Sequence, residues 1–125
     1  MIKFIKIPKD MSRSVLLTET AKYLEESDTP LTPEVMLDAD LSIPNLDYYH
    51  IYIGGRNIGF GVGFPQDEYW FAHRVWLAGR AKIYFKQVIE AMRELKTEEG
   101  YRGIIAHPDS KTASLYKKHN IMKEM

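Results

Sequence analysis

The chain has 125 residues, 17 basic and 17 acidic side chains, and no cysteine. This length suits a single domain, spanning residues 1–125, with a true hydrophobic core. A net charge of zero argues against a polybasic binder of nucleic acid or membranes, and the lack of cysteine excludes disulfides, thiolate metal sites and cysteine nucleophiles. No apolar run approaches the ~20 residues of a membrane helix, and no signal peptide is evident, so we expect a cytoplasmic protein.

The first half of the chain predicts a strand, two helices and a β-hairpin. Ser12 or Ser14 can cap the first helix, and the pair Thr32-Pro33 is typical of a helix start. The run Gly54-Gly55-Arg56-Asn57 is a hairpin turn signal. We therefore expect these elements over residues 1–7, 12–26, 33–37, 48–53 and 58–64.

The second strand of this hairpin carries glycine at alternate positions, Gly59, Gly61 and Gly63. Because strand side chains alternate between faces, one face of this strand has no side chains. Glycine weakens a strand unless something must approach its backbone closely. The pattern predicts space either for a substrate or for a closely packed helix.

The second half predicts alternating strands and helices. Apolar residues recur at helical spacing from Ala81 to Leu95, and Gly100 suits the end of that helix. The expected elements are a strand at 68–72, a helix at 78–95, a strand at 101–106, a helix at 109–119 and a last strand at 121–122. This order predicts an α/β (α+β) fold with a mixed, mostly antiparallel sheet and a β-α-β crossover.

A candidate anion site lies at the junction Trp76–Lys82. Here a strand passes through small residues into a long helix, whose free N–H groups and positive dipole end favour phosphate. Arg80 and Lys82 add cationic donors. The alternative is an ordinary turn before a helix.

The tail from Asp109 to Ile121 holds a second candidate. Tyr116 falls on the same apolar side of its expected helix as Thr112 and Ala113. It is either a tyrosine at the edge of the core or a residue with a chemical role.

Together these two segments resemble the GCN5-related N-acetyltransferase (GNAT) superfamily. Its phosphate-loop pattern, Gln/Arg-x-x-Gly-x-Gly/Ala, is matched by Gly79 and Ala81, with Trp76 as a departure at the first position. Its later pattern is Asn-x-x-Ala-x-x-Leu-Tyr-x-x-x-Gly-Phe, which the tail meets without a gap. The residues at its fixed positions are Asp109, Thr112, Leu115, Tyr116, Asn120 and Ile121, of which Leu115 and Tyr116 are identical.

A narrower resemblance is carried by Val75–Lys82 and the following Phe85-Lys86. This stretch is similar to small acetyltransferase-fold proteins of tailed phages, some of which are head-assembly or internal virion proteins. That resemblance implies a virion or the host cytoplasm as the location.

The GNAT resemblance implies acetyl-CoA as co-substrate, bound where two parallel strands splay apart. Those strands would be residues 68–72 and 101–106. Backbone groups near Phe71 and His73 would hold the pantetheine arm, and the next loop would hold the pyrophosphate. Tyr116 would be the general acid that protonates the CoA thiolate. The cofactor-binding residues implied are Phe71, His73, Gly79, Arg80, Ala81 and Lys82.

A general base is needed because an amine acceptor is protonated near neutral pH. His73 and His107 are the candidates, each near the end of an expected splayed strand, and Glu68 is a third. His107 stands before Pro108 and could simply end a strand. The spacing of the four histidines does not suggest zinc, so we expect no metal.

Three hairpin residues could line an acceptor pocket or simply reflect strand preference: Tyr48, Tyr49 and Tyr52.

The resemblance therefore predicts an N-acetyltransferase acting on an amine of a small molecule or a protein. The alternative is a non-catalytic GNAT-like phage protein with an assembly or virion role. For this fold the chain is short at its C-terminal end, so we expect a homo-oligomer or a partner chain to cover that sheet edge. We expect no nucleic-acid partner and no membrane.

Overall fold

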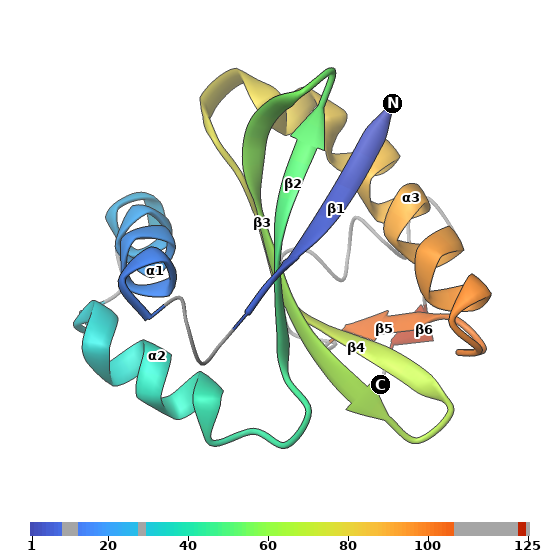
Figure 1. Ribbon diagram of the computed structural model, residues 1–125, viewed down its shortest axis with the longest axis horizontal. Helices are drawn as coiled ribbons and strands as arrows, with labels where there is room; N and C mark the ends of the chain where they lie inside the picture. Colours follow the sequence, from blue (N-terminus) through green and yellow to red (C-terminus); the bar gives the residue numbers. More distant parts are fainter. Residues whose placement is uncertain (9–12, 28–29, 107–122, 125) are drawn as a thin grey trace.

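The computed structural model describes residues 1–8, 13–27, 30–106 and 123–124. Strands within this part form one sheet in the order β1-β2-β3-β4-β5-β6. Helices α1 and α2 lie on one side of this twisted sheet and α3 on the other (Figure 1). The elements are β1 (Ile2–Ile7), α1 (Arg13–Ser27), α2 (Pro33–Leu41), β2 (Asp47–Ile53), β3 (Arg56–Gln66), β4 (Tyr69–Leu77), the 3₁₀ helix η1 (Gly79–Tyr84), α3 (Phe85–Glu98), β5 (Ile104–Ala106) and β6 (Lys123–Glu124).

The pairing of these strands confirms the predicted mixed sheet. Strands β1 to β4 are antiparallel to their neighbours, whereas β4 pairs with β5 in parallel through the crossover helix α3. β5 also pairs in parallel with β6. The expected helix at 109–119 and strand at 121–122 lie outside the described residues.

Capping residues mark the start of α2 and the end of α3. Thr32 is the N-cap of α2, and its side chain accepts a hydrogen bond from the Val35 N–H at 3.2 Å, with Pro33 at the first helical position. Gly100 follows α3 with a φ of 108°, as the predicted C-terminal glycine requires.

The predicted boundary between the fourth strand and the long helix was wrong. β4 continues to Leu77 because β3 is long enough to pair with it as far as Gly59. The following residues form η1 instead of the first turns of an α-helix, and the Ala81 N–H donates to Ala78 O at 2.9 Å. The α-helical part, α3, starts at Phe85. The junction is therefore a tight 3₁₀ turn that leads into the helix.

The glycine face of β3 is packed against protein. A Cβ atom at Gly61 would lie 3.0 Å from the Met92 Cε of α3. At Gly63 it would lie 2.2 Å from the Trp70 ring, and at Gly59 it would lie 1.9 Å from a backbone oxygen of β4. The missing side chains thus leave room for a helix, an indole ring and a neighbouring strand.

Apolar side chains fill both faces of the sheet. Under α3 they include Tyr49, Trp70, Ile89, Met92 and Ile104. Under α1 and α2 they include Leu16, Leu37, Tyr48, Phe60 and Val62.

A lysine is buried within the layer under α3. Lys96 is 2% exposed, and its Nζ lies 4.4 Å from the centre of the Trp70 ring and 4.8 Å from that of Tyr49. It donates to the Tyr49 hydroxyl at 2.7 Å and to Glu99 at 3.0 Å. Burial lowers the pKa of Lys96, although Glu99 opposes that effect. The ammonium is therefore held by ring faces and two oxygen acceptors.

We expect Gly59→Ala to destabilise the protein by about 3 kcal/mol or more, because its Cβ would meet immovable backbone. Gly61→Ala is the matched control. Its nearest neighbour is the flexible end of Met92, so it should stay within about 1 kcal/mol of the parent. Urea unfolding of both variants measures the difference. Equal losses of unfolding free energy would contradict this account.

Candidate functional site

A cavity of about 380 Å³ lies between the N-terminal helices and the sheet. Helix α1, the segment before α2, α2 itself and β4 all contribute to its wall. Its lining residues are Tyr23, Leu31, Val35, Met36, Ala39, Asp40, His73 and Arg74.

The polar centre of this cavity is the buried carboxylate of Asp40, which is 2% exposed. It accepts hydrogen bonds from the Tyr48 hydroxyl at 2.7 Å and from Arg74 Nη1 at 3.0 Å, and the second Arg74 nitrogen bonds its other oxygen. His73 Nε2 lies 3.4 Å from Asp40 Oδ1. One carboxylate therefore joins α2 to β2 and to two consecutive residues of β4.

This network keeps Asp40 ionised. Burial alone raises the pKa of Asp40, but the hydrogen bonds from His73, Arg74 and Tyr48 and the positive charge of Arg74 outweigh it and lower the pKa to about 2. Burial and the neighbouring Asp40 carboxylate raise the pKa of Tyr48, so its hydroxyl stays a donor. Asp40 and Arg74 thus form an ion pair whose charges cancel at physiological pH.

The Arg74 guanidinium is enclosed on its other side by an aromatic ring. Its carbon lies 5.4 Å from the centre of the Tyr23 ring, and only 10% of the side chain is exposed. The Arg74 Nε atom has no hydrogen-bond partner among the described residues. Arg74 is therefore fixed between α1, α2 and the sheet.

His73 owes its direction to a β-bulge. Gly63 pairs with Ala72 while Val62 pairs with Arg74, so His73 is the extra residue of β4. Its imidazole lies about 6 Å from the stacked rings of Phe64 and Phe71 and is about one-third exposed. The bulge thus brings two neighbouring side chains, His73 and Arg74, to the same carboxylate.

Beside the bulge, the two parallel strands part. Arg102 N–H donates to Glu68 O, Trp70 N–H donates to Gly103 O, and the last pair in register is Phe71 with Ile105. Ala106 remains paired with β6 but has no partner in β4. Within the described part of the chain, the pairing of β4 with β5 therefore stops after Phe71, and the edge beside Ala72 and His73 is not paired with β5.

The loop beyond β4 is shaped by Gly79, whose φ is 48° and whose missing Cβ would have open space around it. The N–H groups of Gly79 and Arg80 begin η1, where a helix leaves its first donors without internal partners. Lys82 reaches back and donates to Leu77 O at 2.9 Å. Ala81 is buried, and Arg80 is exposed.

The other residues singled out from the sequence are scattered. Glu68 pairs with Arg102 at 3.0 Å and does not line the cavity. Tyr48 supports Asp40, and Tyr49 packs under α3. Trp76 stacks at a tilt on Phe60 under the N-terminal helices. His107 and Tyr116 lie outside the described residues.

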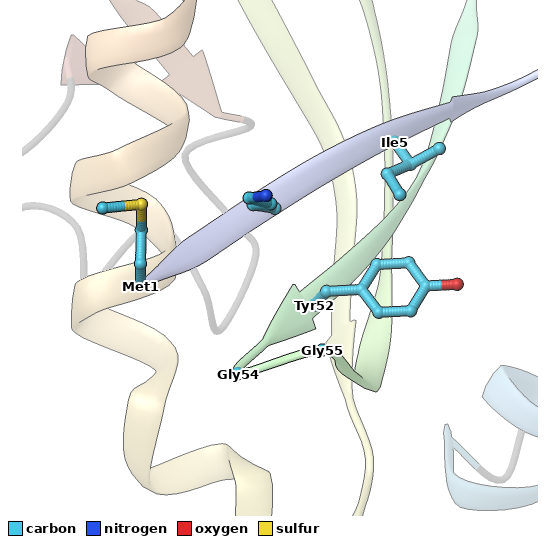
Figure 2. A pocket seen from close by; sticks show the side chains of 6 residues that line it. Met1, Ile5, Tyr52, Gly54 and Gly55 are labelled. Carbon is cyan, nitrogen blue, oxygen red and sulfur yellow. The ribbon is translucent and has the colours of Figure 1, made fainter.

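A larger hollow of about 510 Å³ runs along β1 and the β2–β3 turn. It is lined by Met1, Lys3, Ile5, Tyr52, Gly54 and Gly55 (Figure 2). None of these six residues carries a carboxylate or an imidazole. The cavity at Asp40 is therefore the stronger candidate for chemistry.

Sequence reasoning missed Asp40, Arg74 and Tyr23. A signal for Asp40 existed: it stands three residues after Leu37 and four after Met36, and so on the apolar side of α2. A carboxylate at such a position must find buried partners. Arg74 carried no comparable signal, because its direction depends on the bulge.

Within the described ranges, no helix is long and apolar enough to cross a membrane. The same residues contain no group of three His, Asp or Glu side chains arranged to hold a metal ion.

Comparison with solved structures shows that the chain has the fold of the GNAT acetyltransferases, which confirms the predicted fold. A probable acetyltransferase superposes with a TM-score of 0.66 at 13% identity, over 98% of this chain and 91% of its own. A predicted acetyltransferase from Clostridium acetobutylicum, solved with acetyl-CoA, gives 0.61 at 12% identity, over 98% and 91%.

An aminoglycoside acetyltransferase from an uncultured soil metagenomic sample, solved with sisomicin, gives a TM-score of 0.59 at 12% identity, over 98% of this chain and 87% of its own. No protein-family model matches the chain, and no curated sequence matches it. At these identities the likeness shows the fold.

The Asp40 network predicts a specific acid response. Since the pKa of Asp40 is lowered on folding, its contribution is complete above roughly pH 4 and is lost as the pH falls through about 2. This linkage is worth about 2 kcal/mol. Asp40→Asn should remove that dependence, and it should lower the unfolding free energy at pH 7 by about 3 kcal/mol because it leaves Arg74 buried beside a neutral group.

The control is Asp38→Asn. Asp38 pairs with Arg13 at 3.0 Å but its side chain is 65% exposed, so the change should cost less than about 1 kcal/mol. Denaturant unfolding between pH 2 and pH 7 measures both effects. An unchanged acid response in Asp40→Asn would rule out the assignment.

Proposed function

We propose that this chain, which has the GNAT fold, transfers the acetyl group of acetyl-CoA to an amine. The observation that supports this most directly is the parting of β4 and β5 beside His73. It leaves an open strand edge next to an imidazole, which itself faces a cavity large enough for a small acceptor. A co-substrate along the edge and an amine in the cavity would meet at His73.

The chemistry at this meeting point is direct transfer. His73 takes a proton from the bound ammonium, and the free amine nitrogen attacks the thioester carbonyl. A C–N bond forms, the C–S bond breaks, and the CoA thiolate leaves and takes up a proton. Each step requires that the reacting groups are correctly positioned and that a proton can be transferred. Two side chains, one acting as base and one as acid, and a cavity of fixed shape can meet both requirements.

Asp40 would act on His73 as a positioning residue. The ring nitrogen beside the carboxylate, Nε2, would carry the hydrogen of the neutral imidazole, so that Nδ1 is left to accept the proton of the amine. Since Arg74 and Tyr48 hold the carboxylate in place, His73 would keep one tautomer.

The residues around the open edge fit acetyl-CoA, which supplies the activated acetyl thioester. Backbone groups of β4 from Phe71 to His73 would bind the pantetheine arm by strand addition. The start of η1, with Gly79 and Arg80, would receive the pyrophosphate, and Ala81 and Lys82 would complete that turn. The open space around Gly79 agrees with this use.

The alternative is a non-catalytic protein, such as a phage assembly component that forms an oligomer. Saturable stabilisation of the native protein by acetyl-CoA in a thermal-shift titration supports the enzyme. No shift at millimolar acetyl-CoA would sink the proposed function and leave the structural role.

We expect His73→Gln to lower kcat/KM for acetyl transfer by about 10² to 10³, because the amine would lack its proton acceptor. The dissociation constant for acetyl-CoA should stay within about twofold, since backbone groups bind it. His50→Gln is the matched control: His50 lies on the next-but-one strand near Glu19 and does not line the cavity. Steady-state kinetics with a thiol-detecting assay gives both numbers, and equal rates for the two variants would exclude His73 as the base.

Tyr116 is proposed as the acid that protonates the thiolate. Tyr116→Phe should lower kcat about 10²-fold while acetyl-CoA still binds, since only the phenolic proton is removed. An unchanged kcat would remove Tyr116 from the mechanism.

A further inference from the structure

The charge of the cavity at Asp40 restricts what can enter it. Among its lining residues, Asp40 is the one carboxylate and Arg74 the one permanent cation. Both Asp40 oxygens already accept hydrogen bonds from Arg74. The Tyr48 hydroxyl donates to the same carboxylate, and His73 Nε2 lies close to it. Within this lining, no unpaired negative charge is left to hold a second ammonium besides the one that meets His73.

Two further acidic side chains of α2 do not change this balance. Asp38, on the same helix, is paired with Arg13 and is not part of the lining. Glu34 lies one helical turn before Asp38 and is also outside the lining. A second ammonium inside the cavity would therefore be partly desolvated next to Arg74 without a partner, which is unfavourable.

The rest of the wall is apolar. Tyr23, Met36 and Ala39 are joined there by two aliphatic side chains that are unusually exposed, Leu31 at 46% and Val35 at 55%. The stacked Phe64 and Phe71 rings continue the apolar surface past His73. An alkyl or aryl group in the cavity would cover these side chains and gain hydrophobic free energy.

From this lining we infer that the acceptor is a monoamine with an apolar alkyl or aryl body, and not a polycation of the aminoglycoside kind. The inference rests on the proposed function, because it assigns the cavity to the acceptor. The amine lies toward His73 and the apolar body lies against Leu31 and Val35. This preference differs from that of the structural neighbour that was solved with sisomicin.

Two matched amines test the inference, n-hexylamine and 1,6-diaminohexane, which have the same carbon chain and differ by one ammonium. Their binding is followed by NMR shift changes of Val35 and Ala39 in the full chain without CoA, so that this readout does not depend on catalysis. We expect hexylamine to bind at least tenfold more tightly than the diamine. Sisomicin should behave like the diamine. Equal or tighter binding of the diamine or of sisomicin, or no shift with any of them, would overturn the inference.

A charge variant sharpens the test. Val35→Asp adds a carboxylate at the rim and should raise the affinity of the diamine at least fivefold, while hexylamine gains less. Val15→Asp, a change at an exposed position of α1 outside the cavity, should leave both affinities as they were. An acetyl-CoA titration run in parallel tests the proposed function separately: loss of CoA binding with the expected amine preference would refute the transferase and leave the cavity assignment standing.

Discussion

The buried carboxylate of Asp40 is the interaction on which the N-terminal half of the structure depends. A lone carboxylate in this position would be costly, and it is stable only because Arg74, Tyr48 and His73 reach it from two strands. The same contacts fix α2 against the sheet. The geometry of the cavity and the anchoring of its helical wall therefore have one cause.

The two faces of the sheet divide the remaining work. Under α3, glycines, Trp70 and the buried Lys96 produce a close-packed layer. Under α1 and α2 the layer is incomplete, and a cavity remains. β4 therefore has a close-packed layer on one face and a cavity on the other. This arrangement suits a functional site, because the packed layer fixes the position of the side chains that β4 presents to the cavity.

Local patterns in the sequence predicted most of the elements, and tertiary packing decided the rest. Caps and turn residues such as Thr32 and Gly100 act within a few residues, so they could be read directly. The start of α3 could not, because the extension of β4 depends on the length of β3. Of the candidate site, His73 was predicted, whereas Arg74 and Asp40 were missed because they find each other across 34 positions of sequence. Lysine is rarely fully buried, and Lys96 is buried because the Tyr49 and Trp70 rings and the oxygens of Tyr49 and Glu99 surround its ammonium.

The bulge at His73 also sets the facing of the whole strand. Before it, the even-numbered Trp70 and Ala72 point toward α3, and after it the odd-numbered Val75 and Leu77 do so. One inserted residue thus shifts the frame in which polar and apolar positions alternate. A regular β4 with the same residues and no bulge would turn Arg74 and Trp76 toward the tightly packed layer and leave Val75 and Leu77 facing the N-terminal helices. The strand can therefore lose its extra residue, His73, and keep both faces, whereas the loss or gain of any other single residue would exchange the faces along part of the strand.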